Sequence, residues 1–153
     1  MSIQIGDKLP DFCTVDEESS VLTSEDLLGN ITILYFCSKK DSPEMVEELC
    51  GFRDAISEFK EREVAVFGVT RDTPENNKSF CFSYNLDFPF LSDPSCEIAD
   101  FFGVAEYAGD HVVGIQSATV IIDEEGIIRW KECPIQESGH LDRVVQALDR
   151  LQP

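Results

Sequence analysis

Basic residues are scarce in this chain of 153 residues. It holds 12 Lys and Arg against 30 Asp and Glu, which gives a formal net charge of -18 at pH 7. A negative field of this kind repels the phosphates of nucleic acids and the head groups of anionic lipids. We therefore expect neither a nucleic acid nor a membrane surface as a primary partner.

Long hydrophobic runs and targeting signals are also missing. No apolar stretch approaches the ~20 residues that a membrane-spanning helix needs. The first residues, MSIQIGDKLPDF, lack the basic segment and apolar run of a secretory signal, so we expect a cytoplasmic location. Neither a repeat nor a linker-like segment interrupts the chain, and its length suits one domain spanning residues 1–153.

Closely spaced cysteine pairs are absent, although cysteine itself is not. The six cysteines are Cys13, Cys37, Cys50, Cys81, Cys96 and Cys133. They include no C-x-x-C pair and no His at ligand spacing, so we expect neither a metal nor another cofactor. The chain is 42% apolar and holds eleven Phe, which is enough for a core of its own. We therefore expect mostly thiols, several of them buried, rather than a disulfide scaffold.

The strongest structural signal is an apolar run that leads through a short polar loop into a helix. Ile31–Cys37 predicts a buried strand, and the polar loop Ser38–Ser42 follows it. Ser42 is placed as the helix N-cap, with Pro43 as the first helical residue. Apolar residues then recur at steps of four and three, and Cys50 falls off their stripe. The stripe consists of Met45, Leu49, Phe52, Ile56 and Phe59.

The remaining periodicities predict an α/β fold. Val64–Thr70 reads as a second buried strand, which makes a parallel strand–helix–strand unit with the first. Ala118–Ile122 and Ile127–Lys131 form the clearest hairpin, and an amphipathic helix ends the chain. Tyr107–Gly114 reads as irregular. Together these elements predict one central mixed sheet flanked by helices.

Several strings along nearly the whole chain resemble the peroxiredoxins. The similarity is greatest to the bacterioferritin comigratory protein, or peroxiredoxin Q, branch of the AhpC/TSA proteins. The strings are GDKLPDF, ELCGFRD, VFGVTRD, NLDFPFLSDP and TVIIDEEG. The resemblance implies a thioredoxin-like fold, thiol-dependent reduction of hydroperoxides and a thioredoxin-like reductant. It also suggests a monomer or a weak dimer.

Four positions depart from the active-site pattern that this resemblance implies. The peroxidatic Cys of the family falls on Met45, and the Pro of its loop falls on Ser38. The loop Thr falls on Ser42, and an Arg that precedes the hairpin strand falls on Ser117. A thioether forms neither a thiolate nor a sulfenic acid, and its oxidation stops at a sulfoxide. We therefore expect a degraded peroxidatic site and a binding, regulatory or divergent redox role, with an unidentified protein as the alternative partner.

Three cysteines keep an enzymatic alternative open. Cys50 matches a resolving position of the family, and Cys81 matches a second one in the next helix. Cys37 ends the predicted strand beside Lys39 and Lys40, whose charges favour a thiolate. The alternative is therefore a thiol peroxidase or thiol-disulfide oxidoreductase that uses Cys50 with Cys81 or Cys37.

The other candidate residues have simpler structural interpretations. Met45 begins the apolar stripe and is expected to fill the core, with a sensor thioether as the alternative. Ser42 is explained by helix capping alone. The acidic run Glu44–Glu48 is expected to form a solvated helix face, and His111 and His140, in polar surroundings, receive no role.

Overall fold

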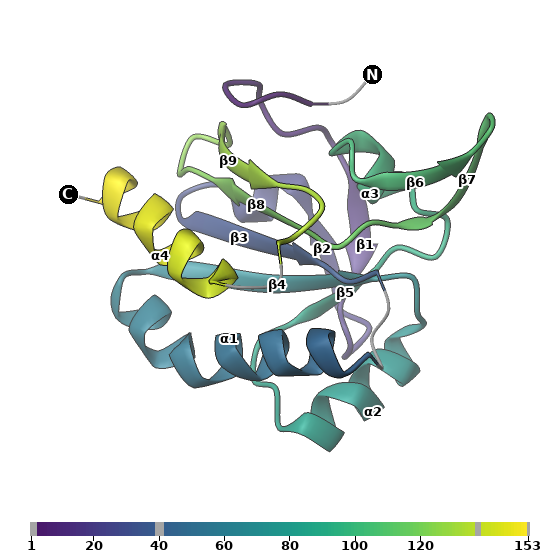
Figure 1. Ribbon diagram of the computed structural model, residues 1–153, viewed down its shortest axis with the longest axis horizontal. Coiled ribbons are helices and arrows are strands. Elements are labelled where there is room, and N and C mark those ends of the chain that lie inside the picture. The colour runs from purple at the N-terminus through teal and green to yellow at the C-terminus, as the bar shows by residue number, and fades with distance from the viewer. Residues whose placement is uncertain (1–2, 39–41, 137–138, 153) are drawn as a thin grey trace.

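A five-stranded mixed sheet forms the centre of the protein in the computed structural model, which describes residues 3–38, 42–136 and 139–152. The strand order is β5–β4–β3–β8–β9 (Figure 1). Its members are β3 (Ile31–Phe36), β4 (Val64–Thr70), β5 (Phe90–Ser92), β8 (Ala118–Ile122) and β9 (Ile128–Glu132). The first three strands are parallel, whereas β8 runs antiparallel to β3 and to β9. The predicted mixed sheet is therefore confirmed.

Helices cover both faces of this sheet. Among the described residues the α-helices are α1 (Pro43–Glu61), α2 (Pro74–Tyr84), α3 (Glu97–Phe101) and α4 (His140–Leu151), and a 3-10 helix, η1, spans Ser24–Leu27. Side chains of α1, α2 and α4 share one core cluster, and those of α3 belong to a second cluster. In Figure 1, α1 and α2 lie along one side of the sheet, and α3 lies on the other side. Among the described residues, none of the helices combines the length and hydrophobicity that a bilayer-spanning segment requires.

The central strand β3 is buried along its whole length because both of its faces are covered. Ile33 and Tyr35 belong to the cluster under α1, and Leu34 and Phe36 belong to the cluster on the opposite face. This alternation follows from the two-residue period of a strand. It directs the hydroxyl-bearing ring of Tyr35 toward α1.

Helix α1 begins as the sequence predicts. Ser42 is the N-cap, and its Oγ accepts a hydrogen bond from the backbone N–H of Met45 at 3.2 Å. Pro43 occupies the first position, where no N–H is needed. The buried residues of the helix are those of the predicted stripe: Met45, Leu49, Phe52, Ile56 and Phe59. Cys50 lies off this stripe and is half-buried.

Two hairpins lie outside the central sheet. Strand β1 (Cys13–Val15) pairs with β2 (Val21–Thr23), and β6 (Ala105–Ala108) pairs with β7 (His111–Ile115). The prediction of irregular structure over Tyr107–Gly114 was therefore wrong. A turn at Gly109, whose φ is +63°, joins the two strands, and a shift of register after Glu106 interrupts the simple alternation that sequence reading relies on.

Candidate functional site

A cavity of about 200 Å³ lies where β3 ends and α1 begins. Its lining consists of Tyr35, Ser38, Ser42, Glu44, Met45, Glu48, Ser117 and Ile135. The structure thus brings together all four positions at which the resemblance predicts a departure from the family's active-site pattern. Three of those four carry small hydroxyl side chains.

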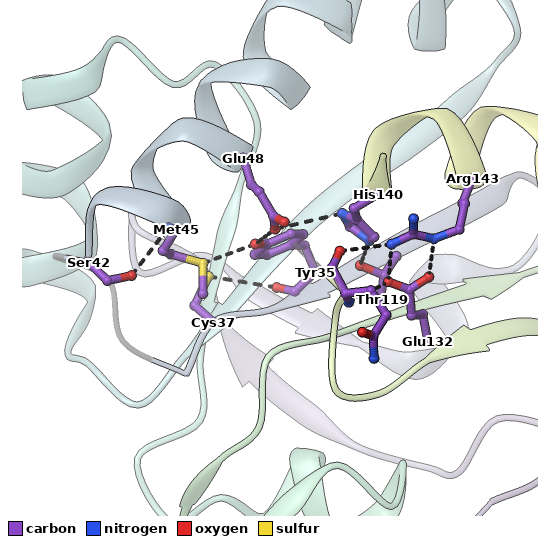
Figure 2. Close-up of polar contacts among 10 residues, drawn as sticks. Tyr35, Cys37, Ser42, Met45, Glu48, Thr119, Glu132, His140 and Arg143 are labelled. Carbon is purple, nitrogen blue, oxygen red and sulfur yellow. Dashed lines mark hydrogen bonds and ion pairs between the residues drawn. The ribbon is translucent and has the colours of Figure 1, made fainter. Parts of the chain in front are cut away.

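Met45 is the sulfur-bearing side chain of this cavity. Only 5% of its surface is exposed. Its backbone is fixed by the cap from Ser42, and the Oη of Tyr35 lies 3.1 Å from its Sδ, in hydrogen-bonding geometry (Figure 2). Met45 therefore packs in the core, as expected, but its sulfur contacts a hydroxyl group at the edge of a polar cavity.

Tyr35 also donates a hydrogen bond to the carboxylate of Glu48. The expectation that the run Glu44–Glu48 is simply a solvated face was therefore wrong for Glu48, whose side chain is 20% exposed. Burial, together with the nearby Cys37 thiol and the Glu48 carboxylate, raises the pKa of Tyr35 well above its ordinary value. The phenol consequently keeps its proton at neutral pH and remains a donor.

The contacts from Met45 through Tyr35 to Glu48 form a chain of polar contacts, which we call the polar chain. His140 extends this polar chain on the opposite side of Glu48. It is the first residue of α4 and is only 3% exposed, so its assignment to polar loop surroundings was wrong. Its Nε2 lies 2.9 Å from Thr119 Oγ1, and its Nδ1 lies 3.7 Å from Glu48 Oε2. Burial lowers the pKa of His140 to about 4, an effect that Glu132 opposes and Arg143 reinforces. The imidazole is therefore neutral at pH 7.

Arg143 and Glu132 form a two-point ion pair beside His140. Arg143 Nε and Nη2 each lie 2.7 Å from a Glu132 carboxylate oxygen (Figure 2). The guanidinium hydrogen bond holds the pKa of Glu132 below its usual range. The Arg143 guanidinium is thus paired with Glu132 at the end of β9. The described lining of the Met45 cavity includes no Arg or Lys.

A second hollow, which we name the acidic cleft, lies between the starts of α1 and α4. It has a volume of about 330 Å³ and is lined by Glu44, Glu47, Glu48, Gly51, Phe52, Gly139, His140, Leu141 and Asp142. Glu44 and Glu48 also line the Met45 cavity, so the two hollows share carboxylates. Despite this acidity, the described residues hold no group of side chains suited to a metal ion.

The candidate cysteines lie in different environments. Cys37 and Cys81 are buried in the same core cluster as Met45, and the Cys37 thiol points to the Tyr35 carbonyl oxygen at 3.9 Å. Cys50, about two turns beyond the start of α1, is half-buried. Lys39 and Lys40, invoked as activators of Cys37, lie outside the described residues. The roles assigned to these cysteines stay predictions.

Sequence reading missed Tyr35, Glu48 and His140 as parts of this site. Two signals were available for the first two. Tyr35 carries the polar tip of an otherwise apolar strand, and Glu48 lies three residues after Met45, on the same side of α1. For His140 the available signal was its spacing, because it lies four residues before Val144 and eight before Leu148, on the buried face of α4.

Comparisons with known proteins agree with this architecture. Residues 5–131 match the AhpC/TSA family. A protein of Coxiella burnetii named as a peroxiredoxin bcp is 37% identical over 97% of this chain and 100% of its own length. Peroxiredoxin Bcp of Bacillus subtilis is 31% identical over 99% of this chain and 96% of its own length.

Solved structures show the same fold. A mutant of PrxQ from Xylella fastidiosa superposes with a TM-score of 0.90 at 25% identity, covering 100% of this chain and 99% of its own. Peroxidoxin BcpB from Mycobacterium tuberculosis gives a TM-score of 0.88 at 24% identity over 97% of both chains. The fold is thus thioredoxin-like, as predicted. The chain belongs to the AhpC/TSA family, and within it to the peroxiredoxin Q, or Bcp, group.

Proposed function

We propose that this protein is a peroxiredoxin Q-like chain that does not turn over hydroperoxides and has instead a binding or regulatory role. The observation that carries the proposal is Met45 at the N-terminus of α1. Its sulfur lies in the cavity where the resemblance places the peroxidatic Cys.

The proposal follows from what peroxide reduction demands. Family chemistry needs a thiolate whose pKa is lowered by the helix N-terminus and by a guanidinium. It also needs a positive charge to stabilise the leaving oxygen. Met45 carries no ionisable thiol, and Ser117 offers a neutral hydroxyl where the family has Arg. Both requirements are therefore unmet at these positions.

A peroxide-consumption assay coupled to thioredoxin, thioredoxin reductase and NADPH tests the proposal. We expect NADPH oxidation at the rate seen without the protein, with Bacillus subtilis peroxiredoxin Bcp as the positive control. Turnover close to that of the control would overturn the proposal. The double variant Met45→Cys with Ser117→Arg should gain activity, because it restores a thiol at the helix start and a guanidinium beside it.

The second candidate function is a thiol enzyme that uses Cys50 with Cys81 or Cys37. The observation in its favour is that Cys50, on α1, is half-buried, whereas Cys37 and Cys81 are buried. Cys50→Ser should then abolish any thiol-linked activity, with Cys133→Ser, at another half-buried cysteine, as the matched control. Equal activity in the two variants would rule this candidate out.

The remaining expectations belong to the same proposal. Family membership supports a thioredoxin-like protein as reductant, and an unidentified protein partner is the alternative. The cytoplasmic location, the single-domain organisation and the monomer or weak dimer stay predictions. Analytical ultracentrifugation, with and without reduced thioredoxin, measures both the oligomeric state and this partnership.

A further inference from the structure

The environment of Met45 differs from that of an ordinary core methionine. Met45 belongs to the apolar cluster under α1, but its Sδ contacts the Tyr35 hydroxyl. The cavity beside the sulfur is lined mainly by polar side chains. Such a cavity is able to hold water or a small polar molecule.

We propose that Met45 is a site of oxidation by small hydroperoxides, which enter the cavity and convert the thioether to the sulfoxide. The inference deepens the proposed function and rests on it, because it assigns a single chemical event to a site that no longer performs thiol turnover. A thioether needs no deprotonation before it attacks a peroxide. The described lining of the cavity includes no guanidinium, so the charge that develops on the leaving oxygen has to be neutralised by a proton instead.

The atoms of the reaction balance with the hydroperoxide as the sole oxidant. A lone pair of Met45 Sδ attacks the terminal oxygen of ROOH, so the S–O bond forms as the O–O bond breaks. The sulfur loses two electrons, and the peroxide is reduced to an alkoxide. The hydrogen of the transferred oxygen passes to this alkoxide, which leaves as an alcohol, or as water when the oxidant is hydrogen peroxide. The sulfoxide persists until a separate reductase acts on it.

Tyr35 is placed to carry that hydrogen. Its hydroxyl lies between Met45 Sδ and the Glu48 carboxylate (Figure 2). By turning its proton from Glu48 to the leaving oxygen and accepting the proton of the transferred oxygen, the phenol would carry the hydrogen between the two and end unchanged. Proton transfer of this kind by a positioned side chain accelerates reactions by about 10²–10⁴-fold in enzymes. His140, held by Thr119, closes the far side of Glu48 and limits where this carboxylate can move.

Oxidation also changes the hydrogen bonding of the cavity. The sulfoxide oxygen is a stronger acceptor than a thioether sulfur, so it competes with Glu48 for the Tyr35 hydroxyl. Glu48, which belongs to α1, contacts Tyr35 of β3 and His140 at the start of α4. The modification therefore acts on the edge of the acidic cleft that these helix ends form.

The test compares the oxidation rate of Met45 in the folded chain with that in the same chain unfolded in urea. Hydrogen peroxide is added to the reduced protein, and the sulfoxide at Met45 is quantified by peptide mass spectrometry, which separates it from cysteine oxidation. N-acetylmethionine amide, with and without urea, corrects for the solvent. We expect oxidation in the folded chain to be faster by at least about tenfold, a modest share of what a positioned proton donor supplies.

Tyr35→Phe should remove this acceleration, whereas Tyr84→Phe, which deletes a hydroxyl on α2, should retain it. Circular dichroism melts establish that both variants are folded. Slower oxidation of Met45 in the folded wild-type chain than in urea would overturn the inference and leave the proposed function standing. Rapid NADPH-coupled turnover with an unoxidised Met45 would overturn the proposed function and this inference together.

Discussion

His140 predicts a specific loss of stability in mild acid. Its pKa is lowered from 6.5 to about 4 in the folded protein, mainly because the imidazole is buried. The unfolded chain therefore binds this proton below pH 6.5, and the folded chain does not until about pH 4. The free energy of unfolding is highest above pH 6.5 and falls as the pH drops through this window.

The size of the effect follows from linkage. Each unit of separation between the two pKa values is worth about 1.4 kcal/mol. Between pH 7 and pH 5 the unfolded state becomes almost fully protonated at this site, which predicts a loss of about 2 kcal/mol. Stopping at pH 5 keeps Glu132 ionised, because Arg143 holds its pKa below its ordinary value.

Urea denaturation of matched histidine variants measures this loss. His140→Gln removes the titrating group. Between pH 7 and pH 5 the variant should therefore lose about 2 kcal/mol less of its free energy of unfolding than the wild-type protein loses. His111→Gln, at the exposed second histidine on β7, should keep the wild-type dependence. Among the described residues, Tyr35, Glu48, Glu132 and Arg143 also face His140, and all of them remain in both variants. The same pH dependence in all three proteins would refute the reasoning.

Three further substitutions test the packing around the site by urea denaturation. Gly68→Ala should cost about 2 kcal/mol, because a Cβ would lie 2.6 Å from the Phe90 ring. Gly51→Ala, in α1, should be stabilising by about 0.5 kcal/mol, because Ala favours a helix more than Gly does and its Cβ would meet Leu141 at an ordinary contact distance of 3.6 Å. Equal effects of the substitutions at Gly68 and Gly51 would contradict this packing. Ser42→Ala should cost about 1 kcal/mol through loss of the N-cap, and an unchanged stability would show that the cap contributes nothing.

The parts of the fold that local periodicity determines could be predicted from the sequence. The apolar stripe from Met45 to Phe59 repeats at the helical period, and the Ser42–Pro43 start obeys capping chemistry that acts within a few residues. Burial of β3 followed from its continuous apolar character. The strings that resemble the family also indicated Ser38, Ser42, Met45 and Ser117, which line the cavity together.

The polar chain around Tyr35 could not be predicted in the same way, because sheet register and helix docking create it. Tyr35 pairs with Thr119 across β3 and β8, and this register places the partner of His140 beside the phenol. His140 reaches Thr119 only when α4 docks against the sheet. The hydrogen bond from Tyr35 to Glu48 likewise depends on how α1 crosses β3.

The hairpin of β6 and β7 was missed for a related reason. Its pattern is interrupted by the register shift after Glu106, and the turn depends on the left-handed conformation of Gly109. Gly114, inside β7, further weakens the strand pattern. Pairing with a neighbouring strand therefore overrode a weak local preference.

The carboxylates shared by the acidic cleft and the Met45 cavity have a consequence for which oxidants reach the sulfur. Glu44 and Glu48 line both hollows, and Glu47 and Asp142 add negative charge in the acidic cleft. The field of these charges repels an anionic oxidant such as peroxymonosulfate and leaves uncharged hydrogen peroxide unaffected. Added salt should narrow the difference between their rates at Met45, since screening weakens the repulsion. The charge of an oxidant should therefore help to set the rate at which it oxidises Met45.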